Sequence, residues 1–292
     1  MVATLSGKTL FVSGGSRGIG LAIAVRAAEE GANVVIAAKT AEPHPKLPGT
    51  IYTAAREIEA AGGAALPVIC DIRDDAQVQA AVSQAVERFG GIDICINNAS
   101  AISLTGTLQT DMKRYDLMNE INARGTFLCS KLTLPYLLES GNPHILNLAP
   151  PLDLSPKWFA RHTAYSIAKY SMSLCTLGMA AEFAVQGVAV NSLWPLTAID
   201  TAAVRFAPGL EKMAMSNRRS PQIMADAAHV ILTRPSRSCT GNFFIDEEVL
   251  REHGVTDLSV YGPAEVGAEL AGDFFVPDEV FARSLTRVKS EY

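Results

Sequence analysis

The segment 10–20, which reads Leu-Phe-Val-Ser-Gly-Gly-Ser-Arg-Gly-Ile-Gly, most constrains what this chain can fold into. An apolar run ends in glycines and a helical pattern follows at once, which predicts a strand, a tight turn and a helix. Glycine lets the backbone approach a ligand closely, and the first turn of a helix offers free N–H groups to a phosphate. A glycine turn that binds nothing is the simpler alternative, but the strand–turn–helix order favours dinucleotide binding. The candidate contacts in this turn are Gly14, Gly15, Ser16, Arg17, Gly18, Ile19 and Gly20.

Strands and helices alternate along the rest of the chain. Apolar runs predict strands over 10–13, 33–38, 65–70, 92–96, 144–148, 188–193 and 242–245. Patterns of helical period predict helices over 21–28, 51–61, 74–89, 112–138 with an interruption near Pro135, 163–185 and 221–233. Proline-rich segments at 39–50 and 149–161 are expected to be loops. This order predicts an α/β fold: a doubly wound, parallel, seven-stranded sheet of Rossmann type, with helices on both faces.

Size and composition suit one domain over 1–292, with 48% hydrophobic and 19% charged residues among 292. We expect a core at about 5–246 and a more polar extension, 247–292, that packs on it. The net charge of −5 gives no reason to expect nucleic acid as a partner, and no apolar run reaches the roughly 18 residues of a membrane span. The ends carry no recognisable signal peptide or peroxisomal address. Five scattered cysteines indicate a reducing compartment without a zinc site, so the expected location is cytoplasmic.

Polar residues at the strand ends indicate the type of cofactor, because ligands of such sheets bind at the carboxyl ends of the strands. The second strand ends at Lys39, where an acidic residue would hold the ribose hydroxyls of NAD and repel a 2′-phosphate. Lys39 and Arg17 can pair with that phosphate, which predicts NADP(H), unless both are ordinary surface cations. Asp71 is a candidate acceptor for the adenine amino group or a turn former. Asn98 and Ala99, after the fourth strand, are further candidate contacts.

Tyr165 and Lys169 lie four residues apart on the helix that follows the fifth strand, and so share one helix face. A phenol has a pKa near 10, and a nearby ammonium group lowers it by stabilising the phenolate. Such a tyrosine can protonate a carbonyl oxygen as a hydride reaches the carbonyl carbon. The pair is also compatible with an ordinary exposed helix surface. Because this helix follows the carboxyl end of the fifth strand, at the same edge of the sheet as the glycine turn, we favour a catalytic role.

Together, Gly14-x3-Gly18-x-Gly20, Asn97-Asn98-Ala99, Asn122 and Tyr165-x3-Lys169 resemble the short-chain dehydrogenase/reductase family over about 5–246. The resemblance implies that Tyr165 is the general acid/base and that Lys169 lowers its pKa and binds the nicotinamide ribose. It implies that Asn122 holds a water in a proton relay. It also implies that 195–201 meets the nicotinamide carboxamide, with Ile199 and Thr201 as candidate contacts.

Two departures from the family pattern bear on activity. The family usually has a serine at the end of the fifth strand, whereas this chain has Leu152 or Ala149-Pro150 there, depending on the register. Ser155, Ser103 or a water are candidate replacements. Because losing one such donor costs about 10²–10³ in rate elsewhere, slow turnover is compatible with the sequence. The second departure is Pro195-Leu196, where Pro-Gly is usual.

The expected function is an NADP(H)-dependent oxidoreductase that acts on a lipophilic carbonyl or secondary alcohol. An NADPH-binding sensor or scaffold with little catalysis is the alternative, and a methyltransferase is a more distant one. Aromatic residues flanking Tyr165 either line an apolar substrate pocket or pack the loops: Trp158, Phe159, His162, Trp194 and Phe206. Relatives pair through their long helices, which predicts a homodimer or homotetramer. Surplus apolar residues on these helices, such as Leu174, Leu177 and Met179, are consistent with such an interface.

Overall fold

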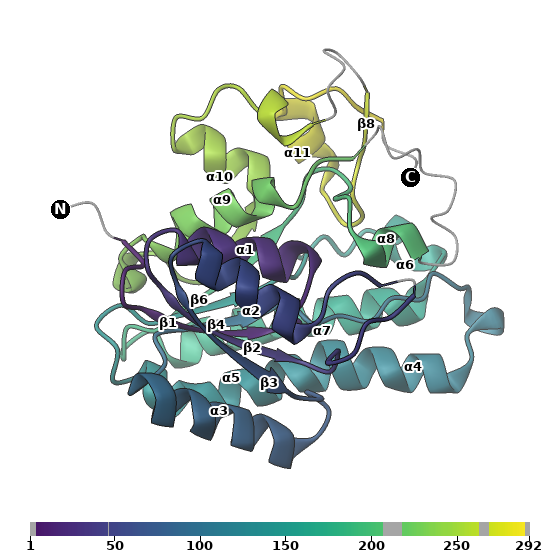
Figure 1. The fold of residues 1–292 in the computed structure, drawn as a ribbon. Helices are drawn as coiled ribbons and strands as arrows, with labels where there is room; N and C mark the ends of the chain where they lie inside the picture. The colour runs from purple at the N-terminus through teal and green to yellow at the C-terminus, as the bar shows by residue number, and fades with distance from the viewer. Residues whose placement is uncertain (1–3, 46, 207–217, 263–268, 290–292) are drawn as a thin grey trace.

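The computed structural model describes residues 4–45, 47–206, 218–262 and 269–289. Its centre is a parallel sheet ordered β3-β2-β1-β4-β5-β6-β7 (Figure 1). The strands are β1 (Thr9–Ser13), β2 (Asn33–Ala38), β3 (Ala64–Ile69), β4 (Ile94–Asn97), β5 (His144–Asn147), β6 (Ala189–Trp194) and β7 (Phe243–Ile245). The winding reverses between β1 and β4, and such a switch point is where doubly wound sheets bind ligands. The predicted fold class and all seven expected strands are confirmed.

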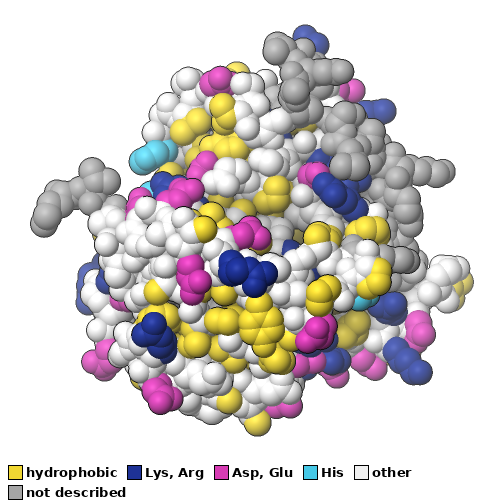
Figure 2. Space-filling view, viewed as in Figure 1, with side chains coloured by type: hydrophobic (Ala, Val, Ile, Leu, Met, Phe, Trp, Pro, Cys, Tyr) yellow, Lys and Arg dark blue, Asp and Glu magenta, His cyan; other side chains and the backbone are white. Residues whose placement is uncertain are grey.

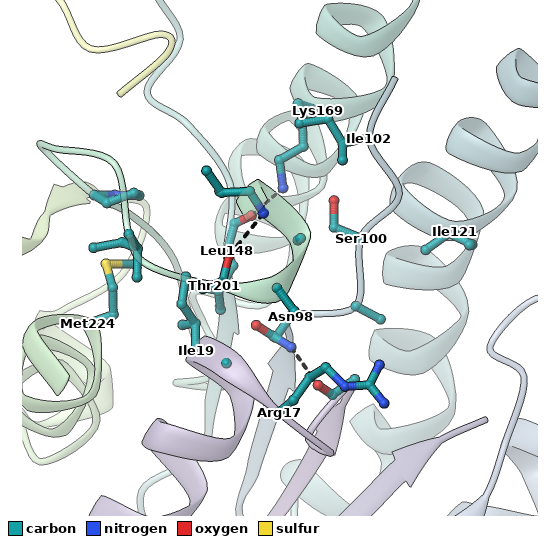
Figure 3. A pocket seen from close by; sticks show the side chains of 18 of the residues that line it. Arg17, Ile19, Asn98, Ser100, Ile102, Ile121, Leu148, Lys169, Thr201 and Met224 are labelled. Carbon is teal, nitrogen blue, oxygen red and sulfur yellow. Dashed lines mark hydrogen bonds between the residues drawn. The ribbon is translucent and has the colours of Figure 1, made fainter. Parts of the chain in front are cut away.

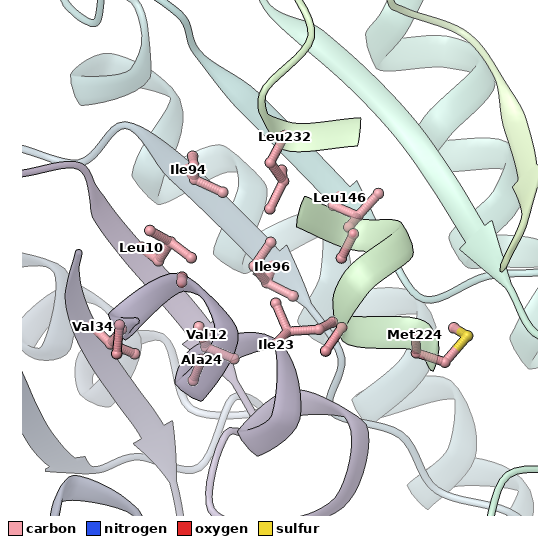
Figure 4. Packing of buried hydrophobic residues seen from close by; sticks show 14 of the residues in the cluster. Leu10, Val12, Ile23, Ala24, Val34, Ile94, Ile96, Leu146, Met224 and Leu232 are labelled. Atoms are coloured by element: carbon pink, nitrogen blue, oxygen red, sulfur yellow. The ribbon is translucent and has the colours of Figure 1, made fainter. Parts of the chain in front are cut away.

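Helices cover both faces of the sheet. One face carries α1 (Gly18–Ala28), α2 (Ile51–Ala60) and α9 (Gln222–Leu232). The other face carries α3 (Asp75–Phe89), α5 (Thr126–Leu137) and α7 (Thr163–Glu182). Strand β1 supplies both layers, because successive side chains of a strand point to opposite faces. Leu10 and Val12 pack with Ile23 of α1, as Figure 4 shows, whereas Phe11 belongs to the cluster on the opposite face.

The long helix expected over 112–138 is present, but its interruption lies elsewhere. It consists of α4 (Met112–Met118), a π-helical turn η2 (Asn119–Gly125) and α5. The predicted break near Pro135 is wrong, because Pro135 lies inside α5. A proline so close to the end of a helix removes one backbone hydrogen bond without ending the helix, and α5 continues to Leu137. The π-helical turn instead places the buried Asn122 against the loop after β4.

Short elements occupy several connections. They are η1 (Thr107–Gln109), α6 (Lys157–Ala160), α8 (Ala202–Phe206), η4 (Ser236–Ser238), α10 (Asp246–Glu252), η5 (Ser259–Tyr261), β8 (Leu270–Ala271), α11 (Asp278–Arg283) and β9 (Val288–Lys289). Helix α6 interrupts the segment 149–161 that was expected to be a loop. Strands β8 and β9 pair in parallel as a separate two-stranded sheet.

In the described part of the extension, 274–276 and Val280 pack against the carboxyl end of β6 and the first part of α7. Phe274 and Phe275 join a third apolar cluster that includes Tyr165 and Trp194. The indole Nε1 of Trp194 donates a hydrogen bond to the carbonyl of Phe274 at 2.7 Å. The extension therefore contacts the helix that carries the predicted catalytic pair.

The surface in Figure 2 carries Lys and Arg side chains interspersed with Asp and Glu. This distribution agrees with the modest net charge of −5. Among the helices within the described ranges, none is both long and apolar enough to cross a membrane.

Candidate active site

A cavity of about 750 Å³ runs along the carboxyl ends of the strands (Figure 3). Its volume falls within the range of about 300–1,000 Å³ that is usual for ligand sites. The predicted residues that line it are Gly14, Ser16, Arg17, Gly18, Ile19, Lys39, Asp71, Asn98, Ala99, Tyr165, Lys169, Ile199 and Thr201. Gly15, Gly20 and Asn122 are not among the described lining residues. The fold thus joins the glycine turn and the tyrosine–lysine pair in one cavity.

The glycine turn depends on close backbone contacts with the end of β4. Gly14 and Gly18 have positive φ angles of 68° and 59°, which glycine adopts readily. A Cβ atom on Gly20 would lie 2.5 Å from Nδ2 of Asn98. That amide nitrogen donates hydrogen bonds to the carbonyls of Ser13 and Gly14, at 3.1 and 3.0 Å. Asn98 therefore fixes the turn, and Gly20 makes room for it.

The residues at the start of α1 fit a phosphate group. Helix α1 begins after Arg17, and no side chain caps its N-terminus. Its first N–H groups are therefore available to a ligand in the adjoining cavity. A Cβ atom on Gly14 would lie 2.9 Å from Cα of Ala99, so glycine is needed there for the turn to pack closely against the segment after β4. This cradle is consistent with the diphosphate of a dinucleotide.

The predicted 2′-phosphate site contains Lys39 and Arg17 in different environments. Lys39 is half-exposed, and its Nζ lies 3.5 Å from a carboxylate oxygen of Asp71. Arg17 donates from Nε and from a terminal nitrogen to the carbonyls of Pro48 and Gly49, both at 2.9 Å. Arg17 therefore also ties the 39–50 loop to the glycine turn.

Asp71 is engaged mainly with its neighbour Arg73. The guanidinium of Arg73 donates to both carboxylate oxygens, and these bonds lower the pKa of Asp71 to about 2. Burial opposes this shift, while the charge of Lys39 adds to it. Asp71 is therefore a carboxylate held at the cavity wall by two cations. Its contact with an adenine amino group stays a prediction.

Tyr165 and Lys169 project from α7 into the opposite end of the cavity. Both side chains are almost fully buried. The ammonium of Lys169 donates to the carbonyl of Leu148 at 2.8 Å and lies 4.9 Å from the centroid of the Trp194 ring. Burial lowers the pKa of Lys169 to about 7, and the carboxylate of Asp273 opposes that shift.

Asn122 is completely buried and supports the cavity wall. Its Oδ1 accepts a hydrogen bond from the backbone N–H of Ala101 at 2.8 Å, and its Nδ2 donates to the carbonyl of Ala101 at 3.0 Å. These bonds fix the loop after β4, which contributes Ser100 and Ile102 to the cavity. A water-holding role for Asn122 stays a prediction.

The end of β5 lacks the hydroxyl that the family pattern would place there. Ala149 and Pro150 are buried, and the carbonyl of Pro150 accepts a hydrogen bond from Ser173 at 2.7 Å. The expected replacements, Ser155 and Ser103, are not among the described residues that line the cavity. Ser100 and Thr201 are lining residues that carry a hydroxyl.

The apolar wall near Tyr165 differs from the expected set of aromatic residues. Trp194 lines the cavity, but Trp158 is fully buried with its indole N–H donating to Asp153 at 2.7 Å. Phe159 stacks on Tyr170, with ring centroids 5.2 Å apart. His162 is buried with its ring against Phe274, and Phe206 is half-exposed outside the described lining. Ile102, Val204 and Phe274 take the expected place of these aromatics.

Among the lining residues that sequence reasoning missed, those farthest along the chain lie in the extension, where 271–274 contribute to the cavity wall. Their local signal is an acidic residue, Asp273, followed by two phenylalanines in a more polar tail. That signal suggests burial but does not specify which part of the sheet the segment reaches.

Residues 8–207 match the protein-family model for the short chain dehydrogenases. The chain belongs to the short-chain dehydrogenase family. It is 62% identical over 272 residues to hydroxysteroid dehydrogenase-like protein 2 of Danio rerio, an alignment that covers 93% of this chain and 64% of that protein. A crystal structure of a short chain dehydrogenase from Mycobacterium thermoresistibile is 55% identical, with a TM-score of 0.88, over 94% of this chain and 96% of the other.

Two distant short-chain dehydrogenase structures share the fold at lower identity. One, from Mycobacterium paratuberculosis, is bound to NAD, with 21% identity and a TM-score of 0.70 over 83% of this chain and 97% of the other. The other, a metagenomic short-chain oxidoreductase, is in complex with NADP, with 24% identity and a TM-score of 0.67 over 82% and 97%. The fold therefore accommodates either nicotinamide cofactor. The family match ends at residue 207, so β7 and the described extension lie beyond it.

Proposed function

We propose that this short-chain dehydrogenase is an NADP(H)-dependent oxidoreductase that acts on a lipophilic carbonyl or secondary alcohol. The observation that carries the proposal is the single cavity that joins the glycine turn to Tyr165 and Lys169. The two ends of the cavity offer a phosphate cradle and a proton donor beside a cation, which are the parts that nicotinamide-dependent carbonyl chemistry requires.

The cofactor-binding roles follow from the residues along the cavity. Gly14, Gly18 and the first turn of α1 would hold the diphosphate, and Lys39 with Arg17 would bind the 2′-phosphate. Ile199 and Thr201 line the segment where the nicotinamide would lie. When bound, NADP(H) supplies or accepts the hydride at the substrate carbon.

Tyr165 would exchange the proton with the substrate oxygen. In reduction its phenolic O–H gives the proton to the developing alkoxide, and in oxidation its phenolate takes the proton of the alcohol. The ammonium of Lys169, fixed by the carbonyl of Leu148, stabilises the phenolate electrostatically. Ile102, Val204 and Phe274 give the nearby wall its apolar character, which supports a lipophilic substrate.

The deciding experiment compares Tyr165→Phe with the wild type on a panel of lipophilic ketones and aldehydes, following NADPH absorbance. We expect turnover to fall by about 10²–10⁴, because the proton donor is lost, while NADPH affinity is kept. Tyr136→Phe, which removes a phenolic hydroxyl from α5, is the matched control and should keep its turnover. Unchanged turnover in the Tyr165 variant would overturn the assignment.

Cofactor choice is tested separately with Lys39→Asp. The carboxylate would repel the 2′-phosphate, so the Kd for NADPH should rise at least about tenfold, with little effect on NADH. Lys113→Asp makes the same charge change on the exposed side of α4 and serves as the control. Equal NADPH affinity in the wild type and the Lys39 variant, measured by calorimetry, would contradict the NADP preference.

An NADPH-binding sensor or scaffold is the second candidate. The observation that favours it is the pair Ala149-Pro150 at the end of β5, which offers no side-chain hydroxyl to a substrate oxygen. Tight NADPH binding without turnover on the whole panel would support this alternative over the enzyme.

We also propose that the chain forms a homodimer or homotetramer through α5 and α7. Leu174 and Leu177 on α7 are 56% and 52% exposed, and Phe127 on α5 is 53% exposed. Met179, expected on the same surface, is instead buried in the core. A monomer in sedimentation experiments at micromolar concentration would contradict this assembly. The cytoplasmic location stays a prediction from cysteine usage.

A further inference from the structure

The segment after β8 is bound to the loop that follows β6. The N–H of Ala198 donates to the carbonyl of Ala271 at 2.9 Å, and Thr197 forms an antiparallel bridge with Gly272. The N–H of Asp273 then donates to the carbonyl of Leu196 at 3.0 Å. These backbone bonds carry the chain along the cavity wall and place Asp273 among its lining residues.

The conformation of the next two residues fixes the direction of this segment. Phe275 is the one described non-glycine residue with a positive φ, 65°, a costly conformation for a bulky side chain. The packing of the side chain holds Phe275 in this conformation: its ring is fully buried, and the ring centroid lies 6.0 Å from the ring centroids of both Tyr165 and Trp194. Phe274 packs edge-on against Tyr165, and its N–H donates to a carboxylate oxygen of Asp273 at 2.7 Å. The strained turn therefore presents Asp273 beside the catalytic helix.

Asp273 lines the same cavity as Lys169, and its negative charge favours the protonated form of the lysine. The other groups around the ammonium are neutral: the carbonyl of Leu148 at 2.8 Å, the sulfur of Met172 at 3.4 Å and the Trp194 ring. The pKa of Asp273 is raised to about 7, mainly by burial; the hydrogen bond from the N–H of Phe274 and the charge of Lys169 oppose this rise, and the negative charge of Asp246 adds to it. Asp246 is itself influenced by Arg219 and Glu247.

We propose that Asp273 is a positioning residue through which the C-terminal extension keeps the ammonium of Lys169 charged beside Tyr165. Both side chains line the same cavity. Trp194 joins the two elements, because its ring lies 4.9 Å from the ammonium and its indole N–H donates to the carbonyl of Phe274, the residue after Asp273. In such a partly buried setting an opposite charge favours the ionised form of the lysine. The inference rests on the proposed function for its catalytic meaning, but the charge relation between the two residues can be tested without turnover.

The first test measures the titration of Lys169 in the full chain by trace acetylation with acetic anhydride across a pH series, read by mass spectrometry. Removing the carboxylate in Asp273→Asn should lower the pKa of Lys169 by about one to three pH units. Asp273→Glu, which keeps the charge, should restore most of the wild-type profile. Asp273→Ser provides the same neutralisation should the asparagine variant fail to fold.

Asp278→Asn is the matched control in the same extension. Asp278 is 78% exposed and pairs with Lys157 on the surface, so its loss changes the net charge equally without facing the cavity. The profile of Lys169 should not move in this variant. A Lys169 profile that is unchanged in the neutral Asp273 variants, or that moves equally in Asp278→Asn, would overturn the inference.

The second test follows the rate against pH in the proposed reaction. In Asp273→Asn the limb of the kcat profile that reports Lys169 should move to lower pH, with little change in KM. At pH values above that limb, kcat should fall about tenfold for every pH unit by which the limb has moved. A fall in kcat that is uniform across pH, without a displaced limb, would contradict the role. A displaced labelling profile in a protein without any turnover would support Asp273 and refute the proposed function.

Discussion

The contact between Asn98 and the glycine turn leads to a sharp prediction for Asn98→Asp. The substitution keeps the shape of the side chain but turns its NH₂ group into an oxygen that only accepts hydrogen bonds. In the wild type this NH₂ donates to the carbonyls of Ser13 and Gly14, at 3.1 and 3.0 Å. In the variant both bonds are lost, and at neutral pH a negative oxygen faces two carbonyl oxygens.

The magnitude follows from these two bonds. Each neutral hydrogen bond contributes about 0.5–1.5 kcal/mol, and the repulsion adds to their loss, so the free energy of unfolding should fall by about 2–3 kcal/mol. At about 2–4 °C per kcal/mol for a large domain, the Tm should fall by about 4–12 °C. The carbonyl oxygens raise the pKa of the introduced carboxyl in the folded state. The destabilisation therefore grows as the pH rises through that pKa, and shrinks at low pH, where the protonated carboxyl can donate one bond.

The assay is thermal unfolding by circular dichroism at about pH 8 and about pH 5.5. Asn98→Ala removes the same two bonds without adding a charge, so its deficit should be similar at both pH values. NADPH titration of both variants should show weaker binding, because the turn that forms the phosphate cradle is no longer fixed. If Asn98→Asp at pH 8 melts with the wild type, or is more stable than the alanine variant, the amide does not hold the turn.

Three further predictions concern the glycine turn, the Asp71 site and the extension. Gly20→Ala would place a methyl group 2.5 Å from the same asparagine amide nitrogen, so calorimetry should show at least about tenfold weaker NADPH binding. Arg73→Ala should return the lowered pKa of Asp71 toward its unfolded value. Because the pKa of Asp71 is lower in the folded protein than in the unfolded chain, its negative charge stabilises the fold at pH values above the unfolded pKa, which is near 4. The difference in the free energy of unfolding between the wild type and Arg73→Ala, measured in urea, should therefore narrow as the pH falls from about 4 toward 2. Arg219→Met should lower the free energy of unfolding in urea by about 3 kcal/mol, because it removes the cation that lies 3.2 Å from the buried carboxylate of Glu247 and leaves it only Arg251, at 3.8 Å. No loss would show that the Arg219–Glu247 pair contributes nothing.

The sheet could be predicted because its strands are buried on both faces and read as uninterrupted apolar runs. Leu10, Phe11 and Val12 are all fully buried although they face different layers of helices. The candidate site was largely predictable for a related reason, since parallel strands bring their carboxyl ends to one edge. Lys39, Asp71 and the residues after β4 therefore meet in one cavity.

Other features depend on contacts that sequence periodicity does not record. The π-helical turn at 119–125 contains no proline or glycine pair from which it could be predicted. Its position reflects the hydrogen bond between Asn122 and the backbone of Ala101. The sequence left open whether the aromatic residues flanking Tyr165 line the cavity or pack the loops, because proximity in sequence does not determine direction. Trp158 points into the core, and Phe274, more than a hundred residues from Tyr165, takes the expected place at the cavity.

The departure from the family pattern at Leu196 is accounted for by the extension. Its backbone N–H donates to the carboxylate of Asp246 at 2.8 Å, and its carbonyl accepts from Asp273 at 3.0 Å. The side chain is 1% exposed and packs in the same cluster as Phe275. A glycine here would leave that apolar space unfilled, because it has no side chain to pack against the extension. The leucine, the two aspartates and the strained phenylalanine are therefore one structural adaptation, in which the end of the chain holds the loop expected to meet the nicotinamide.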